Sequence, residues 1–186
     1  MSTRLAVYAP PSTVLPSLVR RADVGAATWH ALVRDQVVRP LWGDVGVAAD
    51  LDDTPSLRAA ALADLVPRRG VVGRCSAAWV HTGGRPPSRV DVLVAARAHR
   101  ADPDPRRTSA EATLAAEDVV RIGPLRVTTV QRTGTDVARW VGPAQALPVL
   151  ADLCCVGFDP RRALHDLDAM PGQRGVRAAR ATLRAL

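Results

Sequence analysis

The chain has 186 residues, of which 47% are hydrophobic, and it carries a formal net charge of +7. This length suffices to bury a sizeable hydrophobic core without a disulfide or a structural metal. All 25 basic residues are arginine, which excludes Walker A nucleotide hydrolases, Schiff-base enzymes and nucleases with a catalytic lysine.

The positive charge indicates a polyanionic partner. No apolar run approaches the roughly 18 residues that a membrane span needs. Pro10, Pro11 and Pro16 interrupt the N-terminal segment, which therefore lacks a signal-peptide core. The three cysteines are an odd set, and Cys154 and Cys155 are neighbours, so a reducing compartment fits best. We expect a cytoplasmic protein with no membrane partner.

Residues 1–50 begin with two predicted helices. The segment STVLPSLVRR places apolar residues on one helical stripe, with Ser12 as the N-cap. A turn over 22–25 leads to a second helix from Ala26 to about Asp35. The buried side of this second helix is expected to carry Trp29, Leu32 and Val33, and the opposite side then faces outward.

A two-stranded ribbon is predicted directly after the second helix. Residues 37–42 and 45–47 are rich in valine and are separated by Gly43-Asp44, which favours a hairpin. Pro40 cannot donate to a strand ladder, so its strand should be an edge. Helices followed by an edge hairpin are typical of a winged helix-turn-helix over residues 1–50, in which the hairpin is the wing.

The acidic segment 48–55 predicts the boundary of a second domain, residues 51–186. We expect helices over 56–66 and 75–82, then a strand over 89–96 that is covered on both faces. A loop over 102–109 and two strands over 118–130, split by Gly123-Pro124, should follow. Thr133 and Asp136 are spaced as in a capping box at the start of a further helix.

Residues 143–186 predict a helical tail. Its last helix places Arg177, Arg180 and Arg184 on one face, opposite Val176, Ala179 and Leu183. The predicted fold class is therefore α+β: an N-terminal winged helix-turn-helix, a small α/β domain and a helical C-terminal tail.

Four segments, VGRCSAAWVHTG, VDVLVAA, DVVRIGPLRVTTVQRTGTDVAR and GQRGVRAARATL, resemble the AbiEi-type antitoxin family in their serial order, and the likeness runs from about Leu18 to the end. The resemblance implies a winged helix-turn-helix that binds the operator of its own operon, and a C-terminal domain that opposes a nucleotidyltransferase-like toxin in a type IV toxin–antitoxin system. The chain departs from the family in lacking an arginine-rich second helix. We expect no Vsr-like endonuclease domain of the kind that related proteins carry, so no nuclease activity is carried over.

The candidate DNA-contacting residues fall into four groups. The second helix offers Ala27, Thr28, His30 and Arg34, which suit contacts with thymine methyls, base edges or phosphate. The other candidates are Arg20 and Arg21 at the end of the first helix, Arg39 and Trp42 on the wing, and Arg177, Arg180 and Arg184 on the last helix. We expect double-stranded DNA as the partner, and a homodimer on DNA is compatible with such a site.

Each group has a structural alternative. The second helix can be a plain exposed cap, Trp42 can pack the ribbon onto the helices, and Arg20 and Arg21 can interact with a helix dipole. The C-terminal arginines can form a solvated surface or contact an acidic protein. Residues 1–50 hold five arginines against four aspartates, so much of any attraction to DNA must come from elsewhere in the chain. A protein-interaction module that does not read DNA is therefore the alternative function.

No catalytic, metal or cofactor site is predicted, and the chain is not expected to be an enzyme. Ser76 has no activating base beside it, which favours an N-cap or a buried hydroxyl. The segment 132–136 collects polar groups, but a helix start with a locally paired Arg132 explains them. Cys75 and His81 lack zinc-ligand spacing, and a nuclease relic is the weakest of the functional hypotheses.

Overall fold

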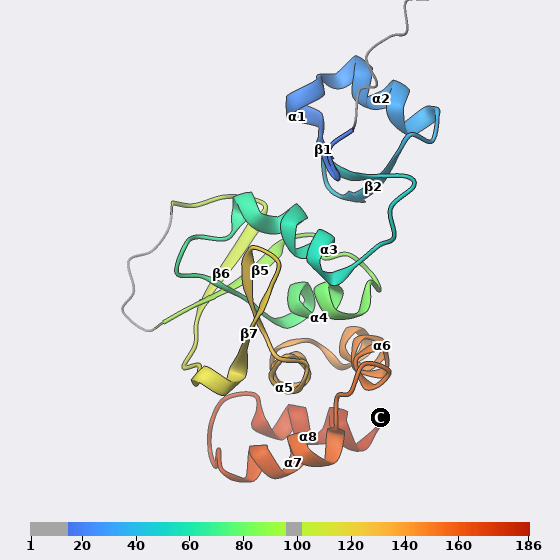
Figure 1. Cartoon of the computed structure of the whole chain (residues 1–186). Helices are drawn as coiled ribbons and strands as arrows, with labels where there is room; N and C mark the ends of the chain where they lie inside the picture. The colour runs from blue at the N-terminus through green and yellow to red at the C-terminus, as the bar shows by residue number, and fades with distance from the viewer. Residues whose placement is uncertain (1–14, 96–101) are drawn as a thin grey trace, which may run out of the picture.

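The computed structural model describes residues 15–95 and 102–186, which form two β-sheets and a set of helices (Figure 1). The mixed α+β class predicted from the sequence is confirmed. Residues 15–48, called the N-terminal unit below, hold the smaller sheet. Residues 55–186, called the body, hold the larger sheet and most of the helices.

The N-terminal unit consists of five short elements: β1 (Leu18–Arg20), α1 (Arg21–Val24), α2 (Ala26–Arg34), β2 (Val38–Trp42) and β3 (Val45–Ala48). Both strand pairings are antiparallel, and the sheet order is β1-β3-β2. Gly25 separates the two helices at a φ of +79°, a conformation that glycine adopts without strain. The second helix, the hairpin and the edge position of the strand with Pro40 agree with the sequence prediction.

The core of the N-terminal unit forms where α2 rests on the sheet. Val19, Trp29 and Val38 are buried together, and Leu32 and Val33 pack against them. Gly46, in the central strand, has no room for a side chain: an added Cβ would lie 2.4 Å from Val38 Cγ1 and 3.1 Å from Trp29 Cη2. The glycine thus lets the indole of α2 approach the middle of the sheet.

The helix predicted to start at Ser12 is wrong where it can be compared. Leu18–Arg20 is a strand, β1, and helix α1, which begins at Arg21, occupies most of the turn expected over 22–25. Ser12 and Val14 lie outside the described residues. The apolar pair Leu18-Val19 fits a helix stripe and a short strand equally well. Its pairing with Val47 and Gly46 of β3 decides for the strand.

The larger sheet has the order β6-β5-β4-β8-β7. Its strands and the helices between them are, in chain order, α3 (Pro55–Leu62), η1 (Ala63–Leu65), β4 (Val71–Val72), α4 (Arg74–Thr82), β5 (Val90–Val94), β6 (Arg107–Glu111), η2 (Ala116–Asp118), β7 (Val119–Ile122) and β8 (Leu125–Thr128). Strand β4 pairs antiparallel with β5 and parallel with β8, which joins the two halves of the sheet.

Helices α5 (Val130–Trp140), α6 (Pro143–Cys154), α7 (Pro160–Asp168) and α8 (Val176–Arg184) complete the body. Helix α4 lies between them and the sheet: Trp79 and Val80 belong to the sheet-side core, whereas Ala78 belongs to the helical core. Leu150, Leu153 and other residues of the last four helices fill that second core. The predicted helical tail is present, with the expected apolar side of α8 buried.

Three details of the body differ from the sequence prediction. Strand β4 was not expected, and β6 begins at Arg107, inside the predicted loop. The cap of α5 is Thr129, whose side chain accepts a hydrogen bond from Arg132 N at 3.4 Å, rather than Thr133. Thr133 is buried in the helix, with its hydroxyl 2.6 Å from that of Thr128.

The segment that joins the unit to the body is fixed at its C-terminal end. Arg58 of α3 is only 5% exposed and pairs with Asp53 at 2.9 Å. Arg58 also donates to the carbonyl of Val80 at 3.0 Å, and Thr54 caps α3 by accepting from Leu57 N at 3.3 Å. The acidic segment expected to be a domain boundary is therefore bound to the body through a buried arginine.

Candidate nucleic-acid interface

The outer face of α2 is accessible. Helices α1 and α2 cover the side of the small sheet that faces away from the body (Figure 1). Because Trp29 is turned to the sheet, Ala27, Thr28, His30 and Arg34 are left exposed. The second helix therefore presents outward the four side chains that the sequence assigned to it.

The arginines beside this face are held by weak ion pairs. Arg34 lies 2.8 Å from Asp35, and these side chains are 74% and 54% exposed. Arg21, at the start of α1, lies 3.3 Å from Asp44, which is also exposed. Exposed pairs of this kind contribute about 1 kcal/mol or less. Both guanidinium groups can therefore exchange a carboxylate for a phosphate at low cost.

Arg20 and Arg39 lie on the opposite face of the small sheet. Arg20 pairs with Val45 and Arg39 with Val47, whereas Val19 and Val38, which contact Trp29, alternate with them. Arg20 reaches the body, where it lies 2.9 Å from Asp64, and Arg39 donates to the carbonyl of Leu51 at 3.1 Å. This placement differs from the prediction that both side chains reach DNA beside α2.

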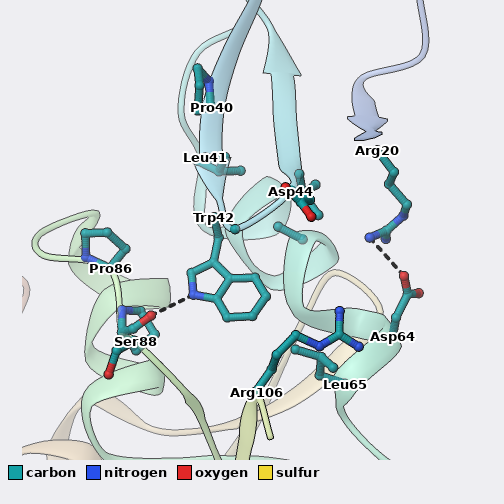
Figure 2. Close-up of a pocket in the computed structure, with 14 residues that line it drawn as sticks. Arg20, Pro40, Leu41, Trp42, Asp44, Asp64, Leu65, Pro86, Ser88 and Arg106 are labelled. Carbon is teal, nitrogen blue, oxygen red and sulfur yellow. Dashed lines mark hydrogen bonds and ion pairs between the residues drawn. The ribbon is translucent and has the colours of Figure 1, made fainter. Parts of the chain in front are cut away.

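The tip of the β2–β3 hairpin is docked on the body around a cleft of about 520 Å³ (Figure 2). Leu41 and Trp42 pack against the sheet-side core, and Trp42 Nε1 donates to the carbonyl of Pro87 at 2.7 Å. Arg20, Asp64 and Arg106 line the same cleft. Trp42 thus follows its structural alternative and packs the ribbon, although against the body rather than against α1 and α2.

The C-terminal arginines form a separate surface. Arg177 and Arg184 are exposed, whereas Arg180 is half-buried and lies 2.7 Å from Asp168. Helix α8 and α2 lie at opposite ends of the molecule (Figure 1). The two groups of candidate residues are therefore not brought together into one face.

The remaining polar motifs have structural roles. The hydroxyl of Ser76 is buried and accepts a hydrogen bond from Asp91 N at 2.8 Å. In the segment 132–136, Arg132 lies 2.9 Å from Asp136 and 2.6 Å from Asp118. Burial raises the pKa of Asp136, while the nearby Arg132 acts to lower it. Over residues 15–95 and 102–186, no group of three or more His, Cys, Asp or Glu side chains is placed to hold a metal ion.

One cluster was not anticipated from the sequence. Arg74, Arg139 and Arg174, from three separate segments, surround the half-exposed ring of Trp140. The only local signal is the dipeptide Arg139-Trp140, because the other two arginines approach the ring through the tertiary fold.

No protein-family model and no curated protein matches the chain. None of the helices in the described ranges has the length and apolar character to cross a membrane.

Proposed function

We propose that the protein is a DNA-binding regulator of the AbiEi antitoxin type and that α2 enters the major groove of its operator. The proposal takes residues 1–50 as a winged helix-turn-helix, with α2 as the recognition helix and β2–β3 as the wing. The element order β1-α1-α2-β2-β3 and the sheet order β1-β3-β2 support this assignment. The exposure of α2 on the side away from the body is the observation that carries it.

The chemistry of the α2 face suits a duplex. Ala27, His30 and Arg34 follow one another at spacings of three and four, so they line one exposed stripe. Arg34 can donate to guanine or to a phosphate, and His30 can contact a phosphate or a base edge. The small Ala27 lets the helix approach closely, and the positive end of the helix dipole at Ala26 favours phosphate.

The wing is not needed for this contact. With Trp42 bound to Pro87 and Arg39 bound to Leu51, the proposed interface reduces to α2 and Arg21. Such a small interface predicts modest affinity for one copy, which two copies on a symmetric operator would raise.

Binding is tested by fluorescence anisotropy, with the DNA upstream of the protein's own gene compared with shuffled DNA of equal length. We expect specific binding that Arg34→Ala weakens by about 1–3 kcal/mol. Arg121→Ala is the matched control: Arg121 is exposed on β7 and its loss changes the charge equally. Equal affinity for the two DNAs, or equal effects of the two variants, would refute the proposed reading of DNA by α2.

The proposed AbiEi type also implies a partner protein. A cognate nucleotidyltransferase-like toxin would be opposed by the body rather than by α2. If the adjacent gene encodes the toxin, its expression should arrest growth, and co-expression of this protein should restore growth. Arg34→Ala should leave this rescue intact while it releases repression of the operon. If one substitution abolished both effects, the separation of the two roles would be wrong.

A protein-interaction module is the second candidate. The observation that favours it is that Arg21 and Arg34 already have carboxylate partners, so the N-terminal unit is nearly neutral. In that case the purified protein would bind the adjacent gene product and show no salt-sensitive DNA binding. The anisotropy experiment above separates the two candidates.

A further inference from the structure

Three guanidinium groups converge on one tryptophan at the C-terminal end of α5. The Cζ atoms of Arg74, Arg139 and Arg174 lie 5.5, 5.2 and 5.8 Å from the centroid of the Trp140 ring. Because all three groups lie this close to one ring, their positive charges are also near one another. Trp140 remains 39% exposed, so the cluster is open to solvent.

The fold brings the three arginines together from different elements. Arg74 opens α4 at a φ of +48°, an uncommon conformation for a residue with a side chain. Gly175, which precedes α8, approaches the end of α5 so closely that an added Cβ would lie 2.6 Å from the carbonyl oxygen of Arg139. Arg139 Nη2 donates to the carbonyl of Arg174 at 3.0 Å, which fixes the neighbouring turn against α5.

No carboxylate makes direct contact with the cluster within the described part of the chain. None of the three arginines makes an ion pair there. The Nε atoms of Arg74 and Arg139 are buried without a hydrogen-bond partner. Asp136 and Asp91 act on these arginines through space, but both are already engaged, since Asp136 pairs with Arg132 and Asp91 accepts hydrogen bonds from the backbone of Ser76 and Cys75.

We propose that Arg74, Arg139, Arg174 and Trp140 form a binding site for the phosphate of a nucleotide, either free or within a single strand. Like charges held this close repel one another, and a bound phosphate dianion or diester would offset that repulsion. Guanidinium groups match phosphate oxygens in geometry, and the part of the Trp140 ring that the arginines leave exposed can contact a base. A purely inorganic anion would leave that indole surface unused.

The site is distinct from the proposed operator contact. It is built from α4, α5 and the turn before α8, and α8 lies at the end of the molecule opposite α2 (Figure 1). A duplex bound to α2 therefore need not supply the phosphate, and the proposal holds whether or not α2 binds DNA.

The test uses the full chain with two probes, a fluorescent ATP analogue and a labelled 12-nucleotide single strand. We expect saturable binding of at least one probe below about 1 mM. Arg174→Ala, at an exposed position, should weaken it about tenfold, as the loss of one charge-assisted contact implies. Arg121→Ala is the control of equal charge, and circular dichroism verifies that each variant folds.

The two probes distinguish the sources of the phosphate. Equal affinities indicate a free nucleotide, whereas a strand bound at least tenfold more tightly indicates nucleic acid. Trp140→Ala, compared with Trp140→Phe, tests the ring, and only the alanine variant should lose most of the binding. The proposal is overturned if neither probe binds, or if Arg174→Ala and Arg121→Ala weaken binding equally.

Discussion

Gly134 in the middle of α5 should resist the substitution that normally stabilises a helix. Replacing a helical glycine with alanine gains about 0.5–1 kcal/mol in backbone entropy and propensity. Here, however, an added Cβ would lie 2.3, 2.4 and 2.6 Å from three carbons of the Phe158 ring, which is buried at 4% exposure. Overpacking of this kind costs about 1–3 kcal/mol, so Gly134→Ala should destabilise the protein by about 1–2 kcal/mol.

Thermal unfolding followed by circular dichroism measures this effect. For a domain of this size, about 1–2 kcal/mol corresponds to a Tm lower by about 2–8 °C. Phe158→Leu removes the ring, and in that background Gly134→Ala should become neutral or stabilising. Gly142→Ala is the control, because a Cβ at Gly142 meets nothing within 4 Å. A higher Tm for Gly134→Ala in the otherwise unchanged protein would refute the steric reasoning.

Three further predictions concern single side chains. Arg58→Met should cost about 1–3 kcal/mol in urea unfolding because it removes the ion pair of the buried guanidinium with Asp53 and leaves the carbonyl of Val80 without its donor; a loss below about 1 kcal/mol would show that the pair behaves as a surface contact. Burial lowers the pKa of His81 from its ordinary 6.5, so the folded chain binds fewer protons there than the unfolded chain. The stabilisation from neutral His81 is complete above pH 6.5 and is lost as pH falls through the folded pKa. The Tm should therefore fall more steeply between about pH 7 and 5 in the unchanged protein than in His81→Gln. Parallel pH profiles of the two proteins would contradict this prediction. Trp42→Phe loses the hydrogen bond to Pro87 and about 1 kcal/mol of stability, yet anisotropy should show unchanged DNA affinity, and weaker binding would place Trp42 in the interface after all.

In the N-terminal unit, the spacing of residues along the sequence was sufficient to predict helix α2 and the hairpin turn. The spacing of Trp29, Leu32 and Val33 gave the inward side of α2, and Gly43-Asp44 gave the hairpin turn. Strand β1 could not be predicted in this way, because Leu18 becomes a strand residue only by pairing with Val47. The same holds for β4, whose two residues are defined by their neighbours in the sheet.

The candidate site likewise has a part that local sequence predicts and a part that depends on the folded chain. The exposed stripe on α2 follows from helical periodicity and was predictable. The diversion of Arg20 to Asp64 and of Trp42 to Pro87 depends on how the unit docks on the body, which no local pattern encodes. The arginines around Trp140 were missed because residues 74, 140 and 174 meet only in the folded chain.

The two sheets differ in how much of the chain must exist before they can close. The smaller sheet is complete once Ala48 has been made, since all its pairings fall within residues 18–48. The two halves of the larger sheet, β6-β5-β4 and β8-β7, are joined only when Val72 pairs with Val127. Closure of so long a loop is entropically slow. During synthesis on the ribosome, the strands that carry α2 should therefore gain amide protection first, while the edge of β4 that faces β8 remains exchangeable until β8 has emerged.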